Sequence, residues 1–368
     1  MRGRPNPQRS MLAIVDLEER VPRDHSLRRI KEVADAAQAR LSPVFDGMYA
    51  RVGRASVPPE RLLKASLLIA LYSVRSERAF CEELEYNLLY RWFLDMDLIE
   101  RSFDATIFTK NRQRLLAHDA GRALFDEVVW AADEEGLLSD EHFSVDGTLI
   151  EAAASLKSFR AKEGPPPPAD DDPGTPSVDF RGERRSNETH ASTTDPEARL
   201  LRKGQGKEAR LAFMGHALME NRHGLLMDFI VSQATGTAER DAVPELLDGV
   251  RERGYRPRTL GADRGYDTQD CVQDIRARRV TPHVAQKKKH SALDGRTTRR
   301  AGYAVSLRIR KRVEEVFGWM KTVGGFRRTR YRGVARTGLA GYLVATAYNL
   351  VRLAKPLDEP EAATGPSG

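Results

Sequence analysis

Apolar residues recur at helical spacing through the first third of the chain. Between positions 61 and 74 they stand at 62, 63, 67, 68 and 71, which is the repeat of one helix face. Pro58-Pro59-Glu60 precedes this run and favours a helix start, because proline is tolerated in the first helical turn. Further helices are predicted over 27–41, 77–93, 106–116 and 120–135. The pattern therefore predicts an all-helical N-terminal domain over residues 1–136.

Two interpretations of these helices stay open. They form either a helix-turn-helix-like unit that contacts DNA or an ordinary helical packing domain. Asp104 is a candidate N-cap for the helix over 106–116, which carries the basic run Lys110-Asn111-Arg112-Gln113-Arg114. Under the first interpretation, residues 104–116 contact DNA, and Lys110 and Arg112 are the candidate DNA-binding side chains.

After His142 the pattern changes to short β-like runs. Residues 143–145 predict a strand that ends on Asp146, and two further strands over 211–219 and 225–232 are separated by a turn signal. Alternating helices and strands follow over 241–253, 258–262, 268–279 and 280–285, and then come helices over 308–321 and 338–353. Early strands followed by alternating helix and strand predict an α/β domain over 137–355, a mixed sheet flanked by helices.

One segment inside this domain has a different composition. Six prolines lie between Pro165 and Pro176, with Asp170-Asp171-Asp172 among them. Such a stretch buries too little apolar surface to order itself, so a flexible Pro/Asp-rich insertion is predicted over 162–195. The tail over 356–368 is predicted to be disordered.

Positive charge is concentrated in one part of the chain. The 368 residues carry a net charge of +7 and a pI near 9.4, which alone is weak evidence for a polyanionic partner. Residues 287–336 hold 16 Lys and Arg against 3 Asp and Glu, a net charge of +13, so the rest of the chain sums to −6. A solvated basic surface is one explanation; phosphate contacts are the other. Arg327 and Arg328 in this segment are candidate DNA contacts.

Two cysteines, Cys81 and Cys271, provide neither a disulfide framework nor zinc-ligand spacing. The longest apolar stretches, 62–74 and 338–351, are shorter than the roughly 20 residues of a membrane span. We expect a cytoplasmic protein without membrane association.

Three acidic residues are the candidate catalytic and metal-binding groups: Asp146, Asp263 and Glu314. Both aspartates follow predicted strands, and strand ends gather in one crevice of such a fold. Carboxylates suit Mg²⁺, and a two-ion site can cut and rejoin DNA. Each residue also has a simpler explanation: Asp146 and Asp263 as turn or cap residues, Glu314 as half of an ion pair with Arg310.

A helical wheel over 308–321 favours Glu314 over Glu315 as the ligand. With about 100° per residue, Glu314 shares one stripe with Arg310 and Lys321 beside the apolar face, whereas the next glutamate lies further towards solvent. Arg310 and Lys321 then flank the site as candidate phosphate-binding cations. Trp319 lies opposite the apolar stripe, where it contacts DNA, a second subunit or another helix of the chain.

The chain resembles the DDE transposases of bacterial insertion sequences, of the insertion-sequence-five type, over residues 57–353. Asp146-Gly147-Thr148 and Asp263-Arg264-Gly265-Tyr266 match the two aspartate motifs of that family. The third motif is a spaced tyrosine, arginine, glutamate and lysine. Arg310, Glu314 and Lys321 hold its last three places, but Leu307 stands where the tyrosine is expected.

This resemblance implies a ribonuclease-H-like catalytic domain that uses two Mg²⁺ ions, with Mn²⁺ as an alternative. It implies that the enzyme cuts transposon ends and joins the 3′ hydroxyl to target DNA. Its expected partner is double-stranded DNA, both inverted-repeat ends and target, with the N-terminal domain on the ends. A homo-oligomer assembled on DNA at the bacterial nucleoid is also expected. The alternatives are a catalytically inactive DNA-binding element protein and a nuclease that cuts without joining.

Overall fold

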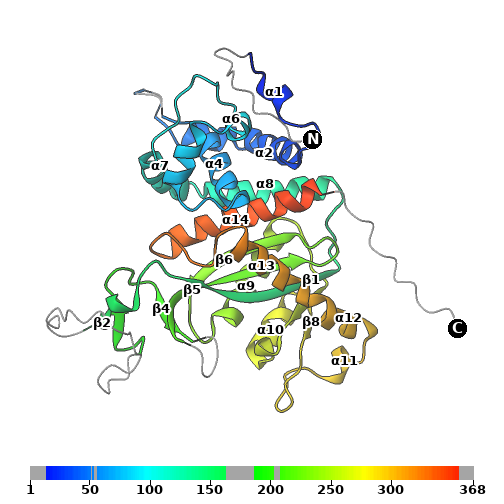
Figure 1. The fold of residues 1–368 in the computed structure, drawn as a ribbon. Helices are drawn as coiled ribbons and strands as arrows, with labels where there is room; N and C mark the ends of the chain where they lie inside the picture. The colour runs from blue at the N-terminus through cyan, green and yellow to red at the C-terminus, as the bar shows by residue number, and fades with distance from the viewer. Residues whose placement is uncertain (1–13, 51, 54–55, 163–185, 203–207, 356–368) are drawn as a thin grey trace, which may run out of the picture.

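The computed structural model describes residues 14–50, 52–53, 56–162, 186–202 and 208–355. Most of the predicted insertion and the whole predicted tail lie outside these residues. The N-terminal part is helical, as predicted (Figure 1). Its helices are α1 (Leu17–Arg20), α2 (Ser26–Arg40), α3 (Ser42–Gly47), α4 (Pro59–Leu71), α5 (Glu77–Leu84), α6 (Leu88–Phe93), α7 (Thr106–Ala117) and α8 (Ala120–Glu134).

The single helix predicted over 77–93 is wrong, because the chain forms two helices there. The side chain of Asn87 accepts a hydrogen bond from the backbone N–H of Tyr90 at 3.2 Å and caps the start of α6. Asparagine favours such caps over helix interiors, since its side chain competes for backbone partners.

The catalytic-domain prediction of a mixed sheet flanked by helices is confirmed. Its strands are β1 (His142–Glu151), β4 (Arg199–Leu201), β5 (Arg210–Glu220), β6 (Leu226–Gln233), β7 (Thr259–Ala262) and β8 (Thr281–Val284). Strand β5 pairs antiparallel with β1, β4 and β6, whereas β7 pairs in parallel with both β1 and β8. The parallel strands therefore lie at one side of the sheet and the antiparallel strands at the other.

Asp146 does not end its strand, contrary to the prediction. Strand β1 continues to Glu151 because its antiparallel pairing with β5 runs from Phe143 through Glu151. The parallel pairing with β7, in contrast, stops at Ser144 opposite Gly261. The sheet therefore opens beside Asp146 even though the strand does not end there.

Helices cover both faces of this sheet. On one face lies α9 (Ala238–Glu252). Its Gly249 packs so closely on β6 that a Cβ added there would be only 2.8 Å from Oδ2 of Asp228. On the opposite face lies α14 (Val334–Ala354). Its Gly341 packs so closely on β6 that a Cβ added there would be only 2.5 Å from the ring of Phe229. Neighbouring strand residues point to opposite faces, so the two helices sandwich β6. Helix α10 (Gln269–Ala277) packs on α9 and β8.

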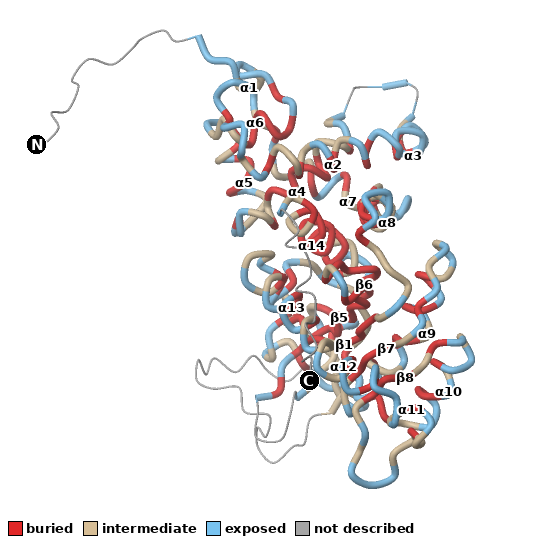
Figure 2. Tube along the Cα trace, turned by 90° about the vertical axis from the view of Figure 1, so that its right-hand side faces the viewer, coloured by how far each residue is buried: buried red, intermediate tan, exposed pale blue. Residues whose placement is uncertain are grey.

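Helix α14 joins the two parts of the chain. It packs against β6 and also against α2, α4 and α8, and Figure 2 shows it buried over most of its length. A helix that is apolar around its circumference belongs in such a position. The N-terminal helices and the sheet consequently share one continuous hydrophobic core.

The continuous helix predicted over 308–321 is also wrong. Helix α12 (Ala301–Ile309) follows the short α11 (Gly295–Thr298), a 3₁₀ turn η4 (Arg310–Arg312) interrupts the chain, and α13 (Val313–Thr322) then begins. Its apolar residues are buried as the wheel predicts. The ring of Trp319 meets that of Tyr348 on α14 at 5.6 Å, so another helix of the same chain covers it.

The predicted insertion is shorter than 162–195. Strand β3 (His190–Ser192) pairs with β2 (Phe159–Ala161), which follows the 3₁₀ turn η1 (Leu156–Ser158), in a small separate sheet. Phe159 is buried and stacks on the ring of His190 at 5.5 Å, which gives these short strands an apolar anchor. No helix in the described part of the chain is long and apolar enough to cross a membrane.

Candidate active site

Asp146 and Asp263 come together where β1 and β7 diverge. Asp146 lies half-buried in the middle of β1. Asp263 follows β7 directly and caps the 3₁₀ turn η3 (Arg264–Tyr266), because its side chain accepts the backbone N–H of Gly265 at 2.6 Å. Parallel neighbouring strands deliver the two carboxylates to one place, as predicted from the sequence.

The surroundings of Asp146 disfavour its negative charge. Burial, and to a smaller extent the nearby carboxylates of Asp263 and Glu239, raise the pKa of Asp146 to about 7. The backbone N–H of Gly147, which donates to Asp146 Oδ1 at 2.8 Å, and the guanidinium of Arg310 act in the opposite direction. Like charges therefore gather at this point of the sheet.

A buried phenol forms the floor of this cluster. Tyr266 is fully buried, and its hydroxyl has no hydrogen-bond partner among the described residues. Burial raises the pKa of Tyr266 well above its ordinary value, and the charges of Asp146, Glu239 and Asp263 add to this effect. The hydroxyl thus lies within electrostatic reach of the same three carboxylates.

Glu239 is the site residue that the sequence analysis missed. It lies in the first turn of α9, and a Cβ added to Gly147 would be 2.6 Å from its Cγ and 2.8 Å from its Oε1. Gly147 therefore provides room for a close approach and not a turn. A glycine inside a strand is a known sign of such an approach, so Gly147 was the signal that the sequence offered.

Arg310 reaches the carboxylates from the other face of the sheet. It begins η4, and a Cβ added to Gly261 on β7 would be 3.3 Å from Cβ of Arg310. Its Nε is buried without a hydrogen-bond partner among the described residues, and its charge lowers the pKa of Asp146. This candidate cation therefore lies beside the aspartate pair.

Glu314 and Lys321 lie on α13, which packs against β1. Glu314 is exposed in the first turn of the helix, and Glu315 is exposed as well, so exposure does not separate them. Lys321 is half-buried in the last turn. In the described ranges no three His, Cys, Asp or Glu side chains are grouped so that they could hold a metal ion. The structure joins Asp146 to Asp263 but does not add Glu314 to a ligand group.

The donor chemistry at the aspartate pair fits a hard divalent cation. Carboxylate oxygens are the ligands that Mg²⁺ and Mn²⁺ prefer, and this cation class neutralises gathered negative charge. The buried, unpaired hydroxyl of Tyr266 provides a further polar atom facing the pair. Asp146 and Asp263 are therefore the residues that would hold such an ion.

The remaining candidate DNA contacts differ in their availability. Lys110 on α7 and Arg327 are exposed. Arg112, in contrast, forms an ion pair with Glu77, and its guanidinium lies 4.4 Å from the ring centre of Tyr331. Arg328 donates hydrogen bonds to the backbone carbonyls of residues 152 and 153 at 3.1 and 3.0 Å. Arg112 and Arg328 are thus already engaged within the chain.

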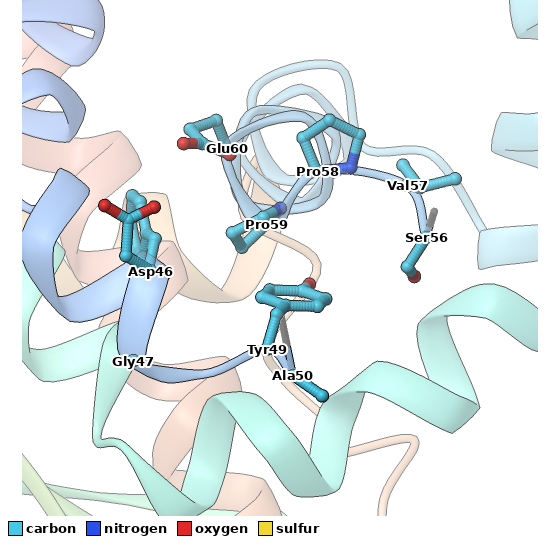
Figure 3. Close-up of a pocket in the computed structure, with 10 residues that line it drawn as sticks. Asp46, Gly47, Tyr49, Ala50, Ser56, Val57, Pro58, Pro59 and Glu60 are labelled. Carbon is cyan, nitrogen blue, oxygen red and sulfur yellow. The ribbon is translucent and has the colours of Figure 1, made fainter. Parts of the chain in front are cut away.

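A hollow lies far from this chemistry, among the N-terminal helices (Figure 3). Its walls include Tyr49, Pro58 and Glu60. Positions 51, 54 and 55 next to these walls lie outside the described residues, so the shape of the hollow carries no functional argument.

Two family models match the chain. The first, "Transposase domain (DUF772)", covers residues 15–114, and the second, "Transposase DDE domain", covers residues 138–350. The second match spans more than half of the chain and includes the aspartate pair together with Arg310, Glu314 and Lys321.

Similar solved structures include three Mos1 complexes. The pre-cleavage Mos1 transpososome has 11% sequence identity and a TM-score of 0.21, with 84% of each chain covered. The Mos1 paired-end complex with the left transposon end has 11% identity and a TM-score of 0.20, covering 76% of this chain and 83% of that one. The Mos1 strand transfer complex has 10% identity and a TM-score of 0.20, covering 83% and 82%. Similarity at this level carries no structural argument.

Proposed function

The chain belongs to the DDE transposase family, and we propose from this premise that it cuts the inverted-repeat ends of an insertion sequence and joins the freed 3′ hydroxyl to target DNA. One observation carries the proposal. Within the matched stretch, Asp146 and Asp263 lie on neighbouring strands where the sheet opens, and burial together with the charge of Asp263 raises the pKa of Asp146 to about 7. A pair of carboxylates held together against repulsion is typical of a cation-dependent phosphoryl-transfer site.

Each residue has a distinct proposed role. Asp146 and Asp263 would hold the metal, and Glu314 on α13 would complete its ligands when DNA is bound. When bound, a pair of Mg²⁺ ions, with Mn²⁺ as the alternative, supplies Lewis acids for the attacking and leaving oxygens. Arg310, beside the aspartates, orients the scissile phosphate through charge-assisted hydrogen bonds, and Lys321 on the same segment binds a neighbouring phosphate.

The wider partner assignments rest on charge and chemistry. The net charge of +13 over residues 287–336 supports a double-stranded DNA partner for the surface around α13. Exposed Lys110 and Arg327 are proposed contacts, and the N-terminal helices are proposed to bind the element's ends. Because two ends must be cut and joined together, we propose a homo-oligomer on DNA, acting at the bacterial nucleoid.

The test is a cleavage and joining assay with Mg²⁺ and DNA that carries the inverted repeats flanking the gene. Wild-type protein is expected to give both cut ends and joined products. Asp263→Asn keeps the cap on η3 but is expected to abolish cutting while end binding persists; Asp270→Asn, an exposed position on α10, is the matched control. Cut ends without joined products would identify a nuclease, and binding without cutting would identify an inactive element protein.

A further inference from the structure

We infer that Glu239 is a positioning residue of the same site, which reaches the Asp146–Asp263 pair past Gly147 and strengthens divalent-cation binding there. This inference rests on the proposed function, because it concerns the cation of that site. Glu239 lies outside the three acidic positions singled out from the sequence.

The first step is the contact across Gly147. The side chain of Asp146 points to the face of the sheet that carries η4, and the next residue points to the opposite face, which carries α9. Glu239 fills the space where any side chain at position 147 would lie, with its Cγ 2.6 Å and its Oε1 2.8 Å from the added Cβ. Its carboxylate therefore lies against the backbone that orients Asp146.

The second step is the attachment of α9 to the other aspartate. Arg240, the neighbour of Glu239, donates from its guanidinium to the carbonyl of Gly265 at 3.4 Å. Gly265 is the residue whose N–H Asp263 caps. The first turn of α9 is thus tied to both segments that carry the aspartates, and Glu239 has a fixed position between them.

The third step is an independent sign of a ligand. The hydroxyl of Tyr266 is completely buried, has no hydrogen-bond partner among the described residues, and lies within electrostatic reach of Asp146, Glu239 and Asp263. A buried unpaired hydroxyl is costly, and acceptors that are all carboxylates repel one another around it. A hydrated divalent cation held by the aspartates would remove both difficulties, because it would neutralise the carboxylates and supply a hydrogen-bond partner for the phenol.

The negative charge of Glu239 determines how this residue changes the stability of the site with and without a bound cation. The charges of three carboxylates act on the phenol, and Arg310 is the cation that acts on Asp146 from η4. The exposed Arg264 and the bonded Arg240 border the cluster. Glu239 increases the repulsion when no cation is bound and increases the attraction when one is. A side chain that only packs against Gly147 would have neither effect.

The experiment measures thermal unfolding of the full chain during Mg²⁺ titration and in EDTA, for wild type, Glu239→Gln and Glu239→Asp. For Glu239→Gln we expect a melting temperature in EDTA at or above that of wild type, and a half-saturating Mg²⁺ concentration about tenfold higher, as is typical when a residue behind a metal ligand is changed. Glu239→Asp keeps the charge and is expected to restore most of the affinity. Glu245→Gln, exposed on the same helix, is the matched control and should match wild type.

Other outcomes separate this inference from the proposed function. If Glu239→Gln lowers the melting temperature equally in EDTA and Mg²⁺ and leaves half-saturation unchanged, the residue is only structural and the inference is wrong. If Glu239→Gln fails to fold, an unchanged half-saturation in Gly147→Ala, which displaces Glu239, overturns it equally. If wild type shows neither Mg²⁺-dependent stabilisation nor cleavage, the proposed function itself fails.

Discussion

Replacing Asp146 with Asn should stabilise the metal-free protein, which is the opposite of what most changes in a buried position do. The carboxyl group has a pKa of 3.8 in its reference state and about 7 in the folded chain. Each unit is worth about 1.4 kcal/mol, so the ionised carboxylate costs the folded state about 4 kcal/mol above neutral pH. Asn removes this charge and keeps an oxygen that accepts the N–H of Gly147.

The pH dependence follows from the sign of this shift. Because the folded pKa is raised, the folded state binds more protons than the unfolded state between pH 3.8 and about 7, and the stability of wild type falls as pH rises through this window. The advantage of Asp146→Asn is therefore between about 1 and 2 kcal/mol at pH 5 and approaches about 4 kcal/mol at pH 8. Below the reference pKa the two proteins should be equally stable.

The assay is urea unfolding in EDTA at pH 5 and pH 8, and saturating Mg²⁺ at pH 8 should narrow the difference by stabilising wild type selectively. Asp270→Asn serves as the exposed control and should show no pH-dependent difference. A variant that is less stable than wild type in EDTA, or an advantage that does not grow between the two pH values, would refute the reasoning.

Three further predictions concern packing and charge. Asn349→Leu should lower the free energy of unfolding by about 2 kcal/mol, because the buried amide on α14 pairs with a backbone N–H and C=O of β6 at 2.9 and 2.8 Å; urea midpoints test it. Arg253→Met should cost about 3 kcal/mol in the same measurement, since it weakens the compensation of the buried carboxylate of Asp228, 3.1 Å away. Arg310→Gln should reduce the salt slope of DNA binding by about one unit, whereas Arg112→Gln should not change it, because that guanidinium is already engaged within the chain.

Local sequence signals predicted those helices and strands whose formation depends on residues nearby in the sequence. Hydrophobic periodicity located most helices of the N-terminal part, and the strand before Asp263 was predicted together with its position at the strand end. The Asp-Gly pair at 146–147 was misleading, because a turn signal yields to a long antiparallel partner such as β5. The pairing partner is remote in sequence, so no local pattern contains it.

Glu239 likewise could not be predicted from a local pattern, because its contact at the site is with a residue remote in sequence. It lies 92 positions from Gly147 along the chain, and only the packing of α9 on the sheet brings the two into contact. The glycine indicated that something approaches the strand closely, but it did not identify the approaching residue. Long-range geometry, and not residue type, determined that part of the site.

The helical wheel for the third motif predicted the buried face of α13 correctly but not the angle between Arg310 and Glu314, for a reason that can be quantified. It assumed about 100° per residue from Arg310 onwards, whereas η4 turns by about 120° per residue over its three residues. The difference sums to roughly 60°, so Arg310 and Glu314 are separated by about 100° and not by the 40° of an unbroken helix. This rotation accounts for the buried guanidinium beside Asp146 and the exposed carboxylate on the following turn.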